Sequence, residues 1–421
     1  LIDKVVRQNS KVHNSVVVQG DWQKIRHLNK HPAVKAIHPV RMVQKFLQDS
    51  TQIINADDAW TQTDSANRSL TGTGITVAVI DTGVDYNHAD LGGCFGAGCK
   101  VESGYDFVEN DDDPMDVDGH GTHVAGIIAA NGSLQGVAPG ASIMALRVLN
   151  DEGFGSTSDI IAAIEYAVDP DDDLSTDDGA DVINLSLGGP GEYQSPGNVA
   201  VENAVAAGIV VVAAAGNYGS YGDIAALSPA SALSAITVAS STKQDQVSGF
   251  SSKGGGASYQ QLKPEIIAPG SDIVSLQVGG GNVTLSGTSM AAPHVAGAAA
   301  ILKQKFPDAT PQDIKAKMIS SAIDIGADAY SQGYGRLDVT GALAQAVTIF
   351  DAGLAFGHVD DSQSEIQYSA FVDIKNDSTQ AVTFELVLPD GVPVQVEIQT
   401  AQTELTVAAN SQERFEVTVL V

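Results

Sequence analysis

The stretch ITVAVIDTGVD, residues 75–85, is a run of apolar and β-branched residues that ends at Asp81 and is followed at once by a glycine turn. Short apolar runs bounded by turn residues are typical of strands that are buried on both faces of a parallel sheet. In such sheets, ligands bind at the carboxyl ends of the strands. Asp81 is therefore a candidate site residue, although a lone aspartate at a strand end is more often a turn or cap residue.

The same kind of strand recurs on either side of this stretch. Between about residues 70 and 350, the segments ASIMALRVL, DVINLSLGG, GIVVVAAAGN and ITVAS alternate with helical patterns such as STSDIIAAIEYAV. This alternation indicates βαβ units. We therefore predict an α/β domain over residues 52–348, with a mostly parallel sheet flanked by helices.

The two ends of the chain have a different character. Residues 1–48 predict a small α+β domain in the order helix, strand, helix, strand, with Asp21 as a helix N-cap. Residues 351–421 contain four strand-like segments separated by turn residues, which predicts a small β-sandwich. Because the sequence still has strand character at residue 421, we expect the protein to continue beyond it.

Composition limits the classes of protein. A chain of 421 residues with 43% hydrophobic residues and mean hydropathy of +0.03 is expected to be globular, with at least two domains. No apolar run reaches the length of a transmembrane helix, and residues 1–20 lack the apolar centre of a signal peptide. Residues 1–50 carry a net charge of +6 and the remainder carries −35. This acidity argues against nucleic acid or an anionic membrane as a partner.

The two cysteines, Cys94 and Cys99, lie in the glycine-rich segment LGGCFGAGCK. A connection of this length can close into a disulfide loop, as is favoured in an oxidising compartment. Two cysteines alone provide too few ligands for a metal site.

The segment DGHGTHVAGIIAA places His120 at or just before the start of a small-residue helix, with His123 one turn later. The pair could suggest a metal site, but the glutamate and the spacing of a zinc-protease helix are absent. For either histidine alone, a packed and hydrogen-bonded role is the simpler interpretation.

The segment GTSMAAPHVAG, residues 287–297, places Ser289 at the start of an apolar helix. The positive end of the helix favours negative charge that develops near the serine. An α/β-hydrolase would require G-x-S-x-G, and Ala291 replaces the second glycine.

The segments VIDTGVD, GHGTHVAG and GTSMAAPHVAG, in this order, closely resemble the three signature motifs of the subtilisin-like serine proteases, the subtilases of peptidase family S8. The resemblance extends over about residues 52–345 and is greatest to the extracellular bacterial branch. It implies a secreted serine endopeptidase in which Ser289 is the nucleophile, His120 the general base and Asp81 the residue that orients the imidazole. Asn217, at the end of VVVAAAGN, would stabilise the oxyanion together with the N–H of Ser289.

The resemblance also implies two edges that bind an extended peptide substrate, and a P1 pocket whose small wall residues predict room for a large apolar or aromatic side chain. The implied substrate-binding residues are Gly153, Gly155, Ser156, Ser186, Leu187, Gly188, Ala213, Ala214 and Gly216.

Calcium is the expected cofactor, with a structural role. In AVDPDDDLSTDDGAD, oxygen-bearing residues recur at the spacing that opens a calcium loop. A solvated acidic loop is the alternative, because Leu174 replaces the glycine of an EF-hand and no glutamate closes the loop. The calcium loop that many relatives have after the histidine motif is not expected, because AANGSLQGVAP is short. The candidate ligands are Asp169, Asp171, Asp173, Ser175 and Asp178.

Residues 1–48 resemble the inhibitory propeptide of secreted subtilases without its early part. Their positive charge should attract the acidic remainder. We predict that cleavage falls between about residues 45 and 52, and that titration of the four histidines in this segment modulates the affinity of the propeptide. These histidines are His13, His27, His31 and His38.

Two other interpretations remain open. The chain could be a catalytically silent subtilase scaffold that binds peptides, and the C-terminal strands could form an adhesive module or a stabilising cap. The expected partners are protein or peptide substrates and the propeptide itself, and the protein is expected to be a monomer.

Overall fold

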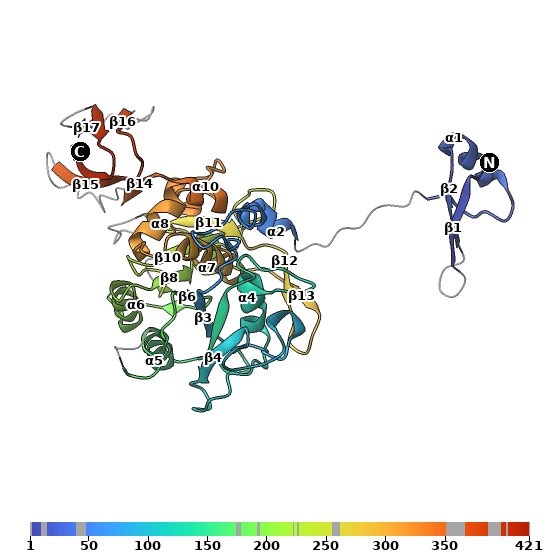
Figure 1. The fold of residues 1–421 in the computed structure, drawn as a ribbon, viewed down its shortest axis with the longest axis horizontal. Coiled ribbons are helices and arrows are strands. Elements are labelled where there is room, and N and C mark those ends of the chain that lie inside the picture. Colours follow the sequence, from blue (N-terminus) through green and yellow to red (C-terminus); the bar gives the residue numbers. More distant parts are fainter. Residues whose placement is uncertain are drawn as a thin grey trace. The chain divides into compact units, whose positions relative to one another are not determined.

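A computed structural model of the protein (Figure 1) describes residues 2–9, 15–38, 48–173, 178–191, 194–221, 223–224, 227–254, 262–350, 367–385, 397–400 and 403–420. The chain divides into two compact units, Leu1–Phe46 and Leu47–Val421. None of the described helices combines the length and the apolar character that crossing a bilayer requires.

The centre of the larger unit is a seven-stranded sheet in which every neighbouring pair is parallel, as the sequence predicts. Asp81 is the last residue of β3, an interior strand that pairs with β6 and β5. The strands, in their order across the sheet, are β11 (Ile266–Pro269), β10 (Ile236–Ser241), β8 (Val210–Ala214), β6 (Val182–Leu185), β3 (Thr76–Asp81), β5 (Ser142–Arg147) and β4 (Val101–Asp106).

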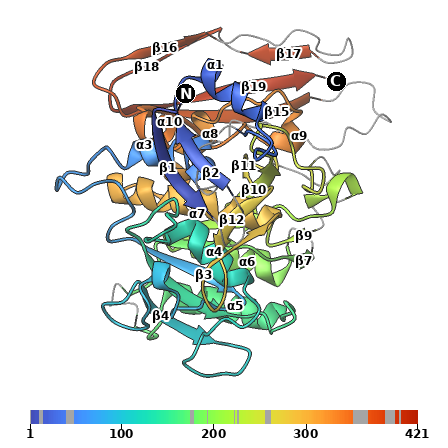
Figure 2. The same cartoon turned by 90° about the vertical axis from the view of Figure 1, so that its right-hand side faces the viewer.

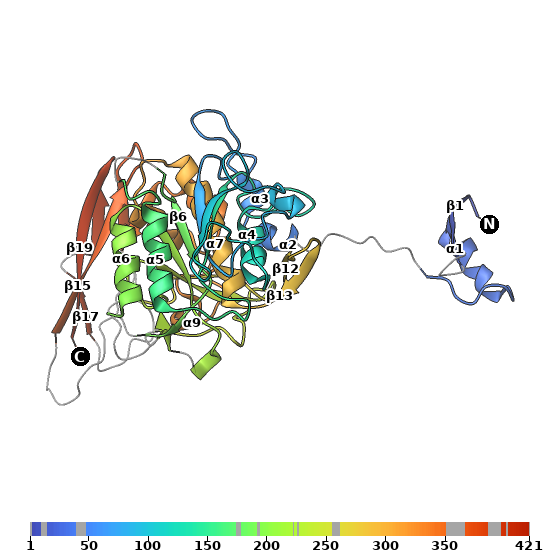
Figure 3. The same cartoon turned by 90° about the horizontal axis from the view of Figure 1, so that it is seen from below.

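Helices cover both faces of this sheet (Figure 3). In β3, Val77 and Val79 join one core cluster, with α4 (His120–Ala129) and α7 (Thr288–Lys305). Ala78 and Ile80 join the other, with α5 (Thr157–Val168) and α6 (Pro196–Ala206). Because successive side chains of a strand point to opposite faces, a strand covered on both sides must be apolar throughout. This requirement explains the uninterrupted apolar run in the sequence.

Shorter elements complete the larger unit. The hairpin β12–β13 immediately precedes α7, and β7 pairs with β9 beside the sheet. The bounds are α2 (Gln48–Ile53), α3 (Ala56–Ala59), η2 (Ala89–Leu91), β7 (Gly189–Pro190), η3 (Gly219–Tyr221), β9 (Leu227–Ser228), β12 (Ile273–Leu276), β13 (Asn282–Leu285), α8 (Pro311–Ser320), α9 (Ala329–Gln332) and α10 (Val339–Ala344).

The C-terminal strands form two antiparallel sheets (Figure 2), and β14 packs against α8 (Figure 1). The four predicted strand segments correspond to β15, β16, β17 and β19, and the sequence missed β14 and β18. Phe415, Val417 and Val419 alternate with more exposed residues along β19 and are buried, as expected where one sheet packs on another. The bounds are β14 (Val347–Phe350), β15 (Gln367–Asn376), β16 (Val382–Glu385), β17 (Glu397–Thr400), β18 (Glu404–Val407) and β19 (Ser411–Leu420).

The smaller unit contains an antiparallel hairpin, β1 (Lys4–Asn9) and β2 (Ser15–Gln19), followed by α1 (Trp22–Ile25) and the 3₁₀ helix η1 (Arg26–Lys30). Asp21 caps α1 as predicted, because its Oδ1 accepts the N–H of Gln23 at 2.9 Å. The predicted first helix is wrong: Lys4–Asn9 is a strand, in which the β-branched Val5 pairs with Val18 of β2. His27, His31 and His38 are exposed, and His13 lies outside the described residues.

Candidate active site

The carboxylate of Asp81 and the ring of His120 form a close pair. Asp81 is fully buried, and its Oδ1 accepts hydrogen bonds from the Nδ1 of His120 at 2.7 Å and from the N–H of Thr82 at 2.8 Å. This pairing places the proton on Nδ1 and leaves Nε2 as the basic nitrogen of the neutral ring.

The electrostatic environment of His120 favours its charged form. Burial opposes the charge, but the nearby carboxylate of Asp81, which also accepts the hydrogen bond, outweighs this effect. Asp118 and Asp116 add smaller attractions, and together these groups raise the pKa of His120 to about 9.

Asp116 organises the loop before His120, a role that its neighbours in the sequence do not suggest. Its Oδ2 accepts the N–H of Thr122 at 2.9 Å and the hydroxyl of Thr122 at 2.6 Å. Its Oδ1 accepts the hydroxyl of Thr82 and the N–H of Gly119, both at 2.9 Å. Burial raises the pKa of Asp116, and these donors oppose the shift. One carboxylate therefore ties the end of β3 to the first turn of α4.

Gly121 allows the helix to approach the strand. A Cβ at this position would lie 2.1 Å from the carbonyl oxygen of Gly83 and 3.1 Å from the Cβ of Asp81. No side chain fits there, so the glycine between His120 and Thr122 is a steric requirement of the Asp81–His120 pair.

Ser289 is the second residue of α7, and it forms two reciprocal hydrogen bonds with Ser186. The hydroxyl of Ser289 donates to the carbonyl of Ser186 at 3.0 Å, and the hydroxyl of Ser186 donates to the carbonyl of Ser289 at 2.8 Å. The buried amide of Asn184 donates to the hydroxyl of Ser186 at 3.0 Å. The hydrogen of the Ser289 hydroxyl is therefore directed at the carbonyl oxygen of Ser186.

The amide of Asn217 is oriented by Thr288. Its Oδ1 accepts the N–H of Thr288 at 2.8 Å and the hydroxyl of Thr288 at 3.0 Å. Its Nδ2 lies 3.5 Å from the Cβ position of Gly287, at the N-terminus of α7. Because Oδ1 accepts both hydrogen bonds from Thr288, the Nδ2 group is the part of the amide that can donate a hydrogen bond at the N-terminus of α7.

His120, Asn217 and Ser289 line one cleft of about 650 Å³. The predicted residues that line it are Gly153, Gly155, Ser186, Leu187, Gly188, Ala214 and Gly216, together with Phe154 of the same predicted segment. Residues that the sequence did not suggest include Asp118, Leu149, Thr157, Ile160, Tyr218, Leu227 and Pro229.

Two predicted substrate-binding residues have other roles in the structure. The hydroxyl of Ser156 accepts the N–H of Asp159 at 3.2 Å and caps α5. Ala213 is fully buried in the core cluster that contains α5 and α6 residues. Neither belongs to the lining of the cleft.

Leu227 lines the cleft and contacts both the segment after β6 and the segment after β8. Leu227 pairs with Pro190 on one side, and its Cδ1 lies 2.9 Å from the Cβ position of Gly216 on the other. Its side chain therefore packs closely against Gly216, where a side chain larger than hydrogen would clash with it.

Residues 72–336 match the model of the subtilase family. The chain belongs to this family. The subtilase is 42% identical over 251 residues to alkaline serine exoprotease A of Vibrio alginolyticus, covering 60% of this chain and 42% of that protein. It is 41% identical over 292 residues to a thermophilic serine proteinase of Bacillus sp. strain AK1, covering 66% of this chain and 65% of that protein. The chain thus spans less than two thirds of the length of both.

Subtilisin E of Bacillus subtilis is 36% identical over 342 residues, covering 80% of this chain and 82% of that protein. A cold-adapted subtilisin-like serine proteinase of known crystal structure is similar to the subtilase at a TM-score of 0.54 and 38% identity, covering 64% of this chain and 90% of that chain. This similarity confirms the predicted fold.

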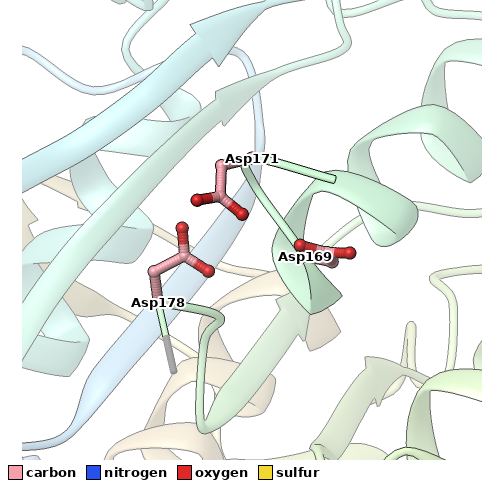
Figure 4. A group of neighbouring side chains, drawn as sticks. All are labelled: Asp169, Asp171 and Asp178. Atoms are coloured by element: carbon pink, nitrogen blue, oxygen red, sulfur yellow. The ribbon is translucent and has the colours of Figure 1, made fainter. Parts of the chain in front are cut away.

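Three of the predicted calcium ligands come together in the acidic loop after α5. Asp169, Asp171 and Asp178 place carboxylate oxygens within 4.8 Å of one another (Figure 4). The backbone N–H of Asp173 donates to the carboxylates of Asp169 and Asp171, both at 3.0 Å. Burial and the neighbouring carboxylates raise the pKa of Asp169. Ser175 lies outside the described residues.

His123 has the packed role that the sequence favours. Its ring is fully buried, and its Nε2 lies 3.1 Å from the carbonyl oxygen of Ile273 in β12. Burial lowers the pKa of His123 to about 4, so the ring is neutral and donates to the hairpin that leads into α7.

Cys94 and Cys99 form a disulfide with a Cα–Cα distance of 5.6 Å, as the sequence predicts. It closes a short loop that includes Phe95, whose ring stacks on that of Tyr86 with the centroids 4.9 Å apart.

Proposed function

We propose that this subtilase is a serine endopeptidase that hydrolyses peptide bonds through an acyl-enzyme, with Asp81, His120 and Ser289 as its catalytic triad. The observation that carries the proposal is the 2.7 Å hydrogen bond between the buried Asp81 and His120, whose ring shares a cleft with Ser289 at the start of a helix.

In the first half of the reaction, the Ser289 hydroxyl rotates to Nε2 of His120 and attacks the scissile carbonyl carbon. A C–O bond forms, the hydroxyl proton moves to Nε2, and the carbonyl electrons become an oxyanion. Asp81 stabilises the positive ring. His120 then gives its proton to the departing amine as the C–N bond breaks.

In the second half, a water molecule gives a proton to Nε2 of His120 and attacks the acyl carbon. The C–O bond to Ser289 then breaks, and His120 returns the proton to the Ser289 oxygen as the carboxylic acid leaves. The oxyanion of both steps accepts hydrogen bonds from Nδ2 of Asn217 and the N–H of Ser289. Both donors are held before the charge develops, which makes them effective.

The substrate lies as an extended strand between the segment Gly153–Gly155 and the segment Ser186–Gly188. Both segments border the cleft and continue from strands of the sheet, so their backbone groups can pair with a peptide. Gly155 has no space for a side chain, since a Cβ would lie 2.1 Å from the carbonyl oxygen of Val148.

Labelling with a fluorophosphonate tests the proposal. The reagent should modify the native protein at Ser289 and leave the Ser289→Ala variant unmodified, while the native protein releases peptides from a denatured protein. A chain that binds peptides without labelling or cleavage would instead be the catalytically silent scaffold.

We also propose that the protein is exported as an inhibited precursor whose residues 1–48 act as a propeptide. The opposite charges of this segment and the remainder, and the disulfide between Cys94 and Cys99, support this proposal. Mass spectrometry of the freshly folded chain should show cleavage between about residues 45 and 52. The Ser289→Ala chain should remain intact, and processing of that variant would show that another protease is responsible.

A further inference from the structure

Asp118 is the only carboxylate among the described residues that line the cleft, and no lysine or arginine is among them. Its side chain is exposed. Its Oδ1 accepts the N–H of His120 at 3.1 Å, which fixes the carboxylate two residues before the proposed general base. An exposed negative charge is thus held at one place in a cleft whose other lining groups are mostly uncharged.

The order of the strands indicates which substrate residue meets this charge. Across the sheet, the segment after β8 comes first, then the segment after β6, then the end of β3 with the His120 loop, then the segment after β5. A substrate strand between the β6 and β5 segments therefore lies over the end of β3. A P1 side chain that enters between the β6 and β8 segments points away from His120.

Side chains of an extended peptide alternate between its two faces. The residue immediately before P1, termed P2, therefore points in the opposite direction, toward the loop that carries Asp118 and His120. On this loop, the side chain of Asp118 is the charged group in the cleft lining that takes no part in the proposed chemistry.

We propose that Asp118 is a specificity-determining residue that favours substrates with lysine or arginine at P2. This inference rests on the proposed peptidase function and names part of its substrate class. The surrounding charge strengthens it, because the chain outside residues 1–50 carries −35 and Asp116 lies two residues away. A cationic side chain at P2 gains attraction, and an acidic one meets repulsion.

The experiment compares two peptide p-nitroanilides that differ only at P2, one with lysine and one with glutamine. An ion pair at an exposed site corresponds to a preference of about 3- to 5-fold in kcat/KM for the lysine peptide. The Asp118→Asn variant should reduce this ratio to about 1. Asparagine is the matched substitution, because its Oδ1 can still accept the N–H of His120.

Two further measurements complete the test. Asp308→Asn removes an exposed carboxylate that is not part of the cleft lining and should keep the native ratio. With the unaltered enzyme, raising sodium chloride from 0.05 to 0.5 M should reduce the lysine preference, since salt screens exposed charges. This arm does not depend on the folding of any variant.

Equal kcat/KM for the two peptides, or a lysine preference that Asp118→Asn and salt both leave unchanged, would overturn the assignment of Asp118. If the protein labels at Ser289 and shows this result, only the specificity proposal is wrong. If the protein neither labels nor cleaves, both the specificity proposal and the peptidase proposal are wrong.

Discussion

Asp116 accepts both the backbone N–H and the hydroxyl of Thr122, at 2.9 and 2.6 Å, and so fixes the first turn of the helix that begins with His120. The same carboxylate accepts the hydroxyl of Thr82, the residue after Asp81. Two members of the proposed triad, from separate elements, are therefore positioned by one buried side chain that does not line the cleft.

Replacing Asp116 with asparagine should lower kcat by about 10- to 100-fold with little change in KM, because an NH₂ group would face donors that now point at oxygen. Loss of a charge-assisted hydrogen bond should also lower the free energy of unfolding by about 2 kcal/mol. Steady-state kinetics and urea unfolding measure the two effects. Asp112→Asn, in an exposed position on the same loop, is the control. An Asp116→Asn enzyme with native kcat would show that Asp116 does not position His120.

The pH dependence of activity follows from the environment of His120. Only the neutral ring accepts the proton of Ser289, and the pKa of His120 is raised to about 9. We therefore expect kcat/KM to rise with pH and to reach half its maximum near pH 9. Asp81→Asn should lower kcat by about 10⁴-fold, because it removes the acceptor that holds the tautomer. A half-maximum at pH 6.5 would contradict the assigned environment.

The contribution of the Asp81–His120 pair to the free energy of unfolding should fall as the pH rises, whereas activity should increase. The folded pKa of His120 lies above the ordinary value of 6.5. The pair with Asp81 therefore contributes fully to the free energy of unfolding below pH 6.5, and this contribution is lost as the pH rises through about 9. The difference in unfolding free energy between the native protein and Asp81→Asn should accordingly be larger at pH 6 than at pH 10. An equal difference at the two pH values would argue against an ionic pair.

The outcome for Asp81 and Asp116 shows what the sequence can and cannot predict here. Parallel strands bring their carboxyl ends to one edge, so a strand-end aspartate and a histidine at a helix start could be expected near one another. Asp116 depends on donors from two other segments, and its neighbours in the sequence do not reveal them. Leu227 was missed for the same reason, because its contacts, Pro190 and Gly216, are distant in the sequence.

The direction of individual side chains is also not evident from the sequence. Ser156 and Ala213 adjoin residues that do line the cleft, but one caps a helix and the other faces the core. A motif gives the position of a segment and leaves the direction of each side chain undetermined. The sequence predicts a helix before the strand SVVVQG, but Lys4–Asn9 is a strand, because a short apolar run does not distinguish the two conformations and pairing with β2 decides between them.

The amide of Asn217 can be tested without disturbing Thr288. In Asn217→Asp the side chain keeps an oxygen for the N–H and hydroxyl of Thr288, but it has no hydrogen to donate to the oxyanion. We expect kcat to fall by about 10²- to 10³-fold, with KM nearly unchanged. Fluorophosphonate labelling and circular dichroism establish that the variant is folded. Native turnover in this variant would exclude Asn217 as an oxyanion donor.

The size of the P1 pocket should depend on Leu227. Because its side chain lines the cleft and its Cδ1 lies 2.9 Å from the Cβ position of Gly216, we expect the native enzyme to prefer small or medium aliphatic P1 residues to aromatic ones. Leu227→Ala should raise kcat/KM for a P1 phenylalanine peptide relative to a P1 alanine peptide by about 10-fold or more. Peptide pairs that differ only at P1 measure this ratio. A native preference for phenylalanine that the substitution leaves unchanged would place the pocket elsewhere.

We propose, finally, that the acidic loop after α5 binds calcium through Asp169, Asp171 and Asp178, whose oxygens lie within 4.8 Å of one another. Carboxylate oxygens at this spacing suit a cation that takes six to eight oxygen ligands. A chelator should lower the melting temperature, and calcium should restore it, because an ion that binds only the folded state stabilises that state. Asp171→Asn should reduce the difference between the two conditions, whereas Asp308→Asn should keep it. If a chelator leaves the melting temperature unchanged, the loop is a solvated acidic surface.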